Sequence, residues 1–163
     1  MQIRTATLAD VPSIMRLDRL SATAGHWTEE QYRQACEPGS TQRLVLVLDE
    51  LAMDESSTPT LRPEAAPDIL GILVAQHIAP EWELENIVVG ASARRKGFGK
   101  RLLQHLLTAA LETNSTAVFL EVRESNAAAR TLYEEAGFVQ TGRRKSYYTN
   151  PPEDAILYRR TLP

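Results

Sequence analysis

The 163-residue sequence has a single cysteine, Cys36, and no long apolar run. One cysteine excludes an intrachain disulfide and a cysteine-rich zinc site, and it is typical of a reducing compartment. The longest uninterrupted aliphatic run is 44–48, whereas a membrane-spanning helix needs about 20 residues. The amino-terminal stretch carries charges at Arg4, Asp10 and Asp18, where a signal peptide has an apolar region. We therefore expect a cytoplasmic protein without membrane contact.

Charge of one sign is not in large excess either. Lys and Arg number 18 against 21 Asp and Glu, a net charge of -3, so nothing predicts a nucleic-acid partner. His26, His77 and His105 lack metal-ligand spacing, and we expect no metal.

Six acids, one base and three prolines are concentrated in residues 49–69. Such a composition does not build a core, and we expect an acidic loop insertion at about 49–69.

Hydrophobic periodicity predicts one α+β domain over residues 1–163, with a mixed sheet. Strands are expected at 2–6, 44–48, 69–77, 83–89, 117–123, 138–141, 146–149 and 155–160. Helices are expected at about 10–20, 28–36, 100–112 and 126–136. The strand–helix–strand order over 83–123 is typical of a βαβ unit with parallel strands. The segments 44–48 and 69–77 are expected to form a long hairpin around the acidic insertion.

A basic, glycine-containing segment separates the strand 83–89 from the helix that follows. It reads Arg94-Arg95-Lys96-Gly97-Phe98-Gly99-Lys100. Its glycines allow a tight turn with amide N–H groups pointing outward at a helix N-terminus, an arrangement that binds anions. A Walker loop needs glycine at 94 and Ser or Thr at 101, and a dinucleotide-binding loop needs glycine at 102. The residues there are Arg94, Arg101 and Leu102, which excludes both.

The pattern Arg94-x-x-Gly97-x-Gly99 after a strand is similar to the pyrophosphate-binding motif of the GNAT superfamily of acyl-CoA N-acyltransferases. A second stretch resembles the ribosomal-protein-alanine N-acetyltransferases, the RimI type of that superfamily. It comprises Leu120-Glu121-Val122-Arg123-x-Ser125-Asn126, Ala128-Ala129, Leu132-Tyr133, Gly137-Phe138, Arg144-Lys145-Ser146-Tyr147-Tyr148 and Glu153-Asp154-Ala155. The resemblance covers about residues 84–158. It implies a single GNAT fold, a mixed sheet flanked by helices, and an acetyl-CoA-dependent N-acetyltransferase.

The resemblance also implies which residues hold the coenzyme. They are Ile87, Val88, Val89, Arg94, Arg95, Lys96, Gly97, Phe98, Gly99, Lys100 and Asn126. In this scheme a β-bulge at Val89 frees a backbone N–H for the thioester oxygen. From the residues alone, the basic cluster also suits a solvated helix start without a ligand. Asn126 equally suits a plain helix cap.

On the same resemblance Glu121 is the general base that takes a proton from the acceptor amine. Tyr133, on one helix face with Ala129 and Asn126, is the general acid for the departing thiolate. A phenol with a pKa near about 10 can protonate a thiolate. Two simpler interpretations stay open: Glu121 as a solvent-facing strand residue, and Tyr133 as a half-buried packing residue.

The acceptor end is expected to be lined by Tyr147, Tyr148, Glu153 and Asp154, although simple hairpin structure also explains these residues. A carboxylate deprotonates an α-amine, with a pKa near about 8, more easily than a lysine near about 10.4. The resemblance implies a peptide N-terminus as acceptor, the N-terminal alanine of a small-subunit ribosomal protein.

Two alternatives remain for the function. One is an acetyltransferase for a small amine such as a polyamine or aminosugar, and the other is a non-catalytic acyl-CoA-binding regulatory module. Three departures from the family pattern leave the substrate open: 26–28 reads His-Trp-Thr where Pro-Trp-Ser is usual, Arg94 replaces a common glutamine, and the acidic stretch is inserted.

Overall fold

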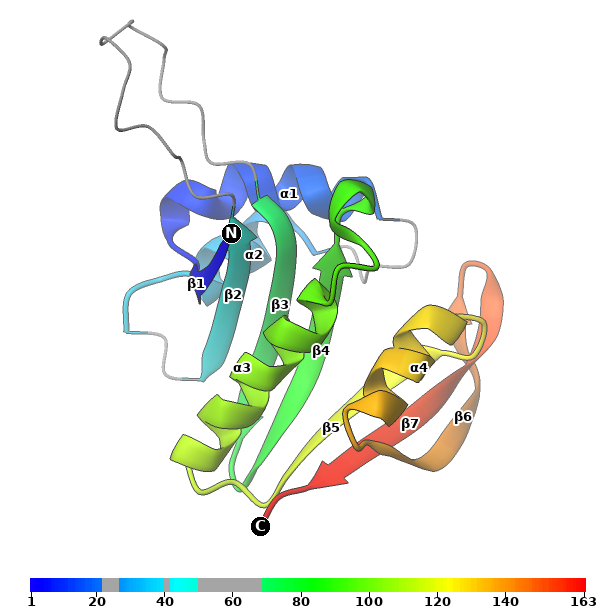
Figure 1. Cartoon of the computed structure of the whole chain (residues 1–163). Coiled ribbons are helices and arrows are strands. Elements are labelled where there is room, and N and C mark those ends of the chain that lie inside the picture. The colour runs from blue at the N-terminus through cyan, green and yellow to red at the C-terminus, as the bar shows by residue number, and fades with distance from the viewer. Residues whose placement is uncertain (22–26, 40–41, 50–68) are drawn as a thin grey trace, which may run out of the picture.

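The structure, a computed structural model, describes residues 1–21, 27–39, 42–49 and 69–163. Within them seven strands form one mixed sheet in the order β1-β2-β3-β4-β5-β7-β6 (Figure 1). The strands are β1 (Gln2–Thr5), β2 (Arg43–Asp49), β3 (Ile69–Ile78), β4 (Glu81–Val89), β5 (Ala117–Arg123), β6 (Val139–Thr149) and β7 (Pro152–Thr161). The helices are α1 (Val11–Arg19), α2 (Glu29–Ala35), α3 (Phe98–Glu112) and α4 (Ala127–Glu135), with 3-10 turns at Leu8–Asp10 and Ala91–Ala93. The α+β prediction is confirmed. Residues 50–68, most of the predicted acidic insertion, lie outside the described residues.

The pairing of β4 with β5 positions the site. These two strands run parallel and are joined by α3, as the predicted βαβ unit requires, whereas the other strand pairs in the described part of the chain are antiparallel. The parallel pairing covers only 81–84 against 117–120. Beyond it the strands diverge, β4 staying with β3 and β5 with β7 (Figure 1).

Helices cover both faces of the sheet and enclose two apolar clusters. On one face Leu102, Leu103 and Leu106 of α3 pack with residues of β3 and β5 and with Tyr133 of α4. On the other face Ile14 of α1 and Tyr32 of α2 pack against β2 and β3. None of the helices in the described segments is long and apolar enough to cross a membrane.

The alternation of side chains along β4 inverts at Glu85. Leu84 and Asn86 pair with successive residues of β3, so Glu85 is one extra residue, a β-bulge. Leu84 belongs to the cluster beneath α3, whereas Val88 belongs to the cluster beneath α1 and α2. Without the bulge, two residues separated by an even number would share a face.

Two expectations about strand regularity are therefore wrong. The bulge expected at Val89 lies at Glu85, and Val89 pairs in register with Gly71. The segments 138–141 and 146–149 are not separate strands but parts of β6, which carries a bulge between Arg144 and Tyr148. Both irregularities depend on the partner strand, which local periodicity does not contain.

Candidate active site

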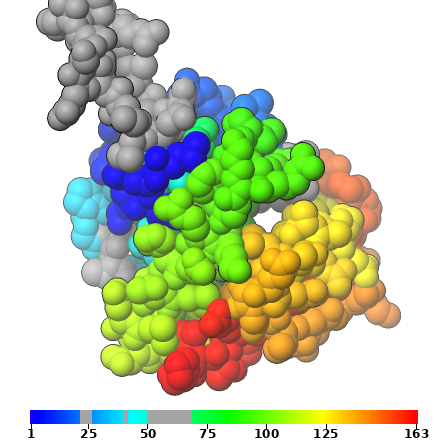
Figure 2. Space-filling view, in the orientation of Figure 1, coloured from blue at the N-terminus to red at the C-terminus, as the bar shows by residue number. Residues whose placement is uncertain are grey.

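Two pockets meet where β4 and β5 separate. The α3–α4 pocket, about 690 Å³, extends from the N-terminus of α3 along α4. The β4–β5 pocket, about 470 Å³, is lined by β4, β5, α4 and β6. Ile87, Asn126 and Ala129 line both, so the two pockets adjoin. Figure 2 shows a hollow between the green surface of the β4–α3 segment and the yellow surface near α4. An elongated ligand in one pocket can therefore meet a second ligand in the other.

The N-terminus of α3 is built to bind an anion. Gly97 caps the helix with a left-handed backbone, φ +78°. A helical hydrogen bond joins the Arg101 N–H to the Gly97 carbonyl, so the amides of the three residues before Arg101 have no acceptor within the helix. These amides and the positive end of the helix dipole attract a phosphate. A Cβ on Gly97 would meet no protein atom within 4 Å, so the turn borders open space.

Most of the residues predicted to hold the coenzyme line the α3–α4 pocket. They are Ile87, Val88, Val89, Arg94, Arg95, Gly97, Phe98, Gly99, Lys100 and Asn126. Lys96 is exposed and does not line either pocket. The Arg94 Nε donates a hydrogen bond to the Val89 carbonyl at 2.9 Å, which fastens the basic turn to the end of β4. Arg95 and Lys100 thus remain as the lining cations for a diphosphate.

Helix α4 forms the opposite wall of the same pocket. The Asn126 Oδ1 accepts a hydrogen bond from the Ala129 N–H at 3.2 Å, so Asn126 acts as a helix cap and also lines both pockets. A Cβ on Gly99 would lie 3.2 Å from Leu132 Cδ2, so glycine allows α3 and α4 to approach closely. The sequence prediction missed the contribution of Ala128 and Leu132 to this wall. The small residues at 128 and 129 are the sequence feature from which this wall could have been predicted.

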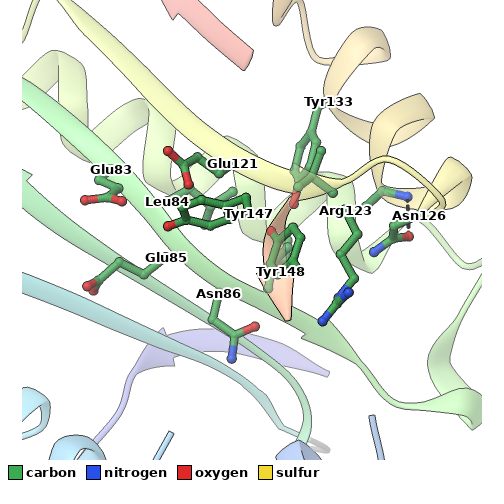
Figure 3. Close-up of a pocket in the computed structure, with 13 residues that line it drawn as sticks. Glu83, Leu84, Glu85, Asn86, Glu121, Arg123, Asn126, Tyr133, Tyr147 and Tyr148 are labelled. Atoms are coloured by element: carbon green, nitrogen blue, oxygen red, sulfur yellow. Dashed lines mark hydrogen bonds between the residues drawn. The ribbon is translucent and has the colours of Figure 1, made fainter. Parts of the chain in front are cut away.

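Glu121 lies in the β4–β5 pocket (Figure 3). Its neighbours in β5, Leu120 and Val122, point into the core beneath α3 and α4, so Glu121 points to the other face of the sheet. Its Oε1 is 3.1 Å from Arg144 Nη2. The pKa of Tyr147 is raised chiefly because its hydroxyl donates a hydrogen bond to the Glu121 carboxylate. Two donors of β6 therefore hold this carboxylate in the pocket.

Tyr133 reaches the same pocket from α4. Its side chain is 5% exposed, and its ring packs 6.0 Å from Phe138 and 6.1 Å from Tyr158, measured between ring centroids. Figure 3 shows its hydroxyl directed toward Tyr148. Burial raises the pKa of Tyr133 above that of a free phenol, so the hydroxyl keeps its proton at neutral pH. Tyr133 is thus a packing residue whose hydroxyl end borders the pocket.

Tyr147 and Tyr148 both line the β4–β5 pocket, although adjacent residues of a regular strand point to opposite faces. The bulge in β6 makes this possible, and the two rings meet edge to face with centroids 5.2 Å apart. The Arg123 guanidinium lies 4.1 Å from the Tyr148 ring centroid. Burial raises the pKa of Tyr148.

Glu153 and Asp154 do not line either pocket. Glu153 accepts hydrogen bonds from the Ser125 N–H at 2.5 Å and from Arg123 at 3.2 Å. Asp154 accepts from the Ser146 N–H at 2.8 Å and from Arg143 at 3.2 Å. The two acids thus fasten β7 to the turn before α4 and to the bulge of β6, as the hairpin interpretation predicts.

Two further carboxylates, Glu83 and Glu85, line the β4–β5 pocket and were not predicted from the sequence. Arg43 donates two hydrogen bonds to Glu85, at 3.0 and 3.1 Å. Burial and the charges of Glu85 and Glu121 raise the pKa of Glu83. The available signal was the recurrence of Glu at 81, 83 and 85 in an otherwise apolar strand. Across the described segments, no group of three His, Cys, Asp or Glu side chains is arranged to hold a metal ion.

The known proteins that this chain resembles are acetyltransferases. A model of the acetyltransferase (GNAT) family matches residues 22–138. The ribosomal protein bS18-alanine N-acetyltransferase of Escherichia coli strain K12 is 41% identical over 86 residues, which are 52% of this chain and 58% of that protein. The enzyme of the same name from Haemophilus influenzae is 41% identical over 92 residues, 55% of this chain and 62% of that protein. The chain therefore spans about three fifths of the length of these relatives.

Solved structures show a similar architecture over nearly the whole chain. The crystal structure of the ribosomal-protein-S18-alanine N-acetyltransferase from E. coli superposes with a TM-score of 0.78 at 26% identity, covering 99% of this chain and 93% of that one. Arabidopsis thaliana NAA60, crystallised with acetyl-CoA, gives a TM-score of 0.83 at 14% identity, covering 99% and 98%. The second likeness concerns the fold alone.

Proposed function

Because the chain belongs to the acetyltransferase (GNAT) family, we propose that it transfers an acetyl group from acetyl-CoA to the N-terminal amine of a protein. One observation carries this proposal: two pockets adjoin at Ile87, Asn126 and Ala129, which line both. The first contains an anion cradle at a helix N-terminus, and the second contains Glu121 and Tyr133.

The α3–α4 pocket suits coenzyme A in its anionic and its amide parts. The amides at the start of α3, with Arg95 and Lys100, would hold the diphosphate. Beyond Leu84 the β4 edge that faces β5 has no strand partner among the described residues, so backbone groups there can pair with the pantetheine amides as an added strand would. Acetyl-CoA supplies the acetyl group as a thioester.

Glu121 and Tyr133 would move the protons. Amide formation requires the acceptor nitrogen to lose a proton, and Glu121 is a carboxylate placed in the acceptor pocket to take it. The departing thiolate needs a proton, and the protonated Tyr133 lines the β4–β5 pocket one helical turn after Ala129, which lines both pockets. Both groups lie on packed elements, β5 and α4, which limits their movement and favours catalysis through orientation.

We assign the acceptor as a protein N-terminus, with the N-terminal alanine of a small-subunit ribosomal protein as the specific candidate. Relatives named for that substrate support it, at 41% identity over part of the chain. The acceptor pocket carries three carboxylates against the guanidinium groups of Arg43, Arg123 and Arg144, and it is lined by three tyrosines. The lone, buried cysteine suits a cytoplasmic enzyme.

A panel of acceptors tests the proposal. The protein is incubated with acetyl-CoA and peptides that begin with alanine, matched peptides with a blocked N-terminus and one internal lysine, polyamines and an aminosugar. Fragmentation mass spectrometry then locates the added acetyl group. Acetylation at the α-amine of the alanine peptides is the expected result. Preference for polyamine or aminosugar would establish the small-amine alternative, and tight coenzyme binding without any acetylated amine would indicate a regulatory module.

A further inference from the structure

Among the described residues, the α3–α4 pocket is lined by one acidic side chain, Glu135 at the end of α4. This carboxylate has no hydrogen-bond or ion-pair partner in the part of the chain that the structure describes. The charged side chains that line the pocket with it are Arg94, Arg95 and Lys100. Coenzyme A carries several negative charges. A free carboxylate in its pocket would therefore weaken binding, unless it meets a part of the coenzyme that donates hydrogen bonds.

The position of Glu135 along α4 shows which part of the coenzyme it meets. Ala128, Leu132 and Glu135 line the pocket at spacings of four and three, so they share one face of the helix. Asn126, at the start of α4, lines both pockets, and Leu132 packs against Gly99 of the anion cradle, where α3 and α4 lie side by side (Figure 1). Glu135 lies about 4.5 Å beyond Leu132 along the helix. Along α4 the pocket thus leads from the acceptor site, past the cradle, to Glu135.

The covalent order of acetyl-CoA follows the same direction. Its thioester is joined through pantetheine to the diphosphate, and the diphosphate is joined to adenosine that carries a 3′-phosphate. When the thioester lies beside Asn126 and the diphosphate lies at the α3 amides, the adenosine comes next, beyond Leu132. The 6-amino group of adenine is a neutral hydrogen-bond donor. An acid at position 135 therefore suits the base and not the phosphates.

We propose that Glu135 recognises the adenine of the coenzyme by accepting a hydrogen bond from its 6-amino group. This inference rests on the proposed function. An ionised carboxylate is an acceptor only, and its hydrogen bonds are stronger than those between neutral groups. A 3′-phosphate beside Glu135 would bring two negative charges together, whereas Arg95 and Lys100, near the start of α3, can take that phosphate. Glu135 thus selects a base with a donor at this position.

Binding of coenzyme analogues tests the inference without turnover. The ligands are coenzyme A, its 3′-dephospho form, and an analogue in which hydrogen replaces the adenine 6-amino group, each titrated by calorimetry. We expect the wild type to bind coenzyme A about 10-fold more tightly than the deamino analogue. Glu135→Ala should lose this preference, and Glu135→Gln, whose amide oxygen still accepts, should keep part of it. Glu112→Ala, an exposed change outside both pockets, should keep it in full.

The outcomes separate this inference from the proposed function. If the wild type binds none of the three ligands, the proposed function fails. If it binds coenzyme A and the deamino analogue equally, only the role of Glu135 is overturned. A rise in the affinity of Glu135→Ala for coenzyme A, absent with the dephospho form, also overturns it, because the carboxylate would then face the 3′-phosphate. Loss of the preference in Glu112→Ala would overturn it as well, since any lost charge would then have the same effect. Circular dichroism establishes that each variant is folded.

Discussion

Arg144 Nη2 lies 3.1 Å from Glu121 Oε1, and this ion pair connects the bulged edge strand β6 to the centre of the sheet. The arginine side chain is 54% exposed and the glutamate side chain 18%. The carboxylate is thus covered mainly by the strand that also brings Tyr147 and Tyr148 to the acceptor pocket. The walls of the proposed acceptor pocket and the position of the proposed base therefore depend on the same bulge.

Replacement of that base should lower turnover at every pH. We expect Glu121→Gln to reduce kcat by about 100-fold or more, because a proton leaves the nitrogen during bond formation even when the amine is already neutral. Steady-state rates between pH 6 and 10, with the alanine peptide, measure the effect. Glu112→Gln, an exposed change at the end of α3, is the matched control. A wild-type rate in Glu121→Gln would remove the residue from the mechanism.

Removal of the Tyr133 hydroxyl should affect chemistry but not the coenzyme. Tyr133→Phe preserves the contacts of the ring with Phe138 and Tyr158, so the protein should stay folded. We expect kcat to fall by roughly 10- to 100-fold, since the thiolate loses its proton donor, with the Kd for coenzyme A nearly unchanged. Isothermal titration and single-turnover rates distinguish the two quantities. Unchanged turnover would leave Tyr133 with a packing role only.

The anion cradle can be tested with two glycines of the same backbone conformation. Gly97 has φ +78° and Gly39 has φ +90°, and a Cβ on either meets no atom of the described residues within 4 Å. Gly97→Ala and Gly39→Ala should therefore both lose about 1 kcal/mol of stability through strain. Gly97→Ala alone should weaken coenzyme A binding, by about 10-fold, because its methyl group enters the pocket beside the α3 amides. Thermal melts and coenzyme titrations measure the two effects, and equal coenzyme affinity in both variants would contradict the cradle.

The pairing of Arg4 with Asp10 predicts acid sensitivity away from the site. Asp10 is 2% exposed and accepts two hydrogen bonds from Arg4, both at 2.8 Å, and one from the Thr7 N–H. The bond from Arg4 is the main cause of the lowered pKa of Asp10. A lowered folded-state pKa contributes stability above the unfolded value, near about 4, and this stability is lost as the pH falls through the folded value.

Asp10→Asn should consequently lower the free energy of unfolding by about 2 kcal/mol at pH 7. The difference from the wild type should narrow as the pH falls below about 4. Urea unfolding at several pH values measures it. Glu29→Gln removes an exposed i,i+4 partner of Arg33 and should change stability by less than about 0.5 kcal/mol. A difference for Asp10→Asn that does not narrow as the pH falls from 5 to 2 would contradict the assignment.

Local rules were sufficient for most of the secondary structure. The helix expected at 28–36 begins at Thr28, which forms a capping box with Gln31, and β5 covers the predicted range 117–123. The helix expected at 126–136 is followed by Gly137 at φ +81°. These features depend on residues within a few positions of one another, so the sequence contains the whole signal. The left-handed turn at Gly97 before α3 was predictable for the same reason.

By itself, the sequence determined the α+β elements, the basic turn at a helix start, and two candidate groups, Glu121 and Tyr133. Only the tertiary structure decided which acids face the acceptor. The pairing of β4 with β5 puts Glu83 and Glu121 in one pocket, whereas Glu153 accepts hydrogen bonds from Ser125 and Arg123 outside it. The physical reason is that strand register and side-chain pairing join residues 28 to 42 positions apart or more, and no local pattern specifies such pairs.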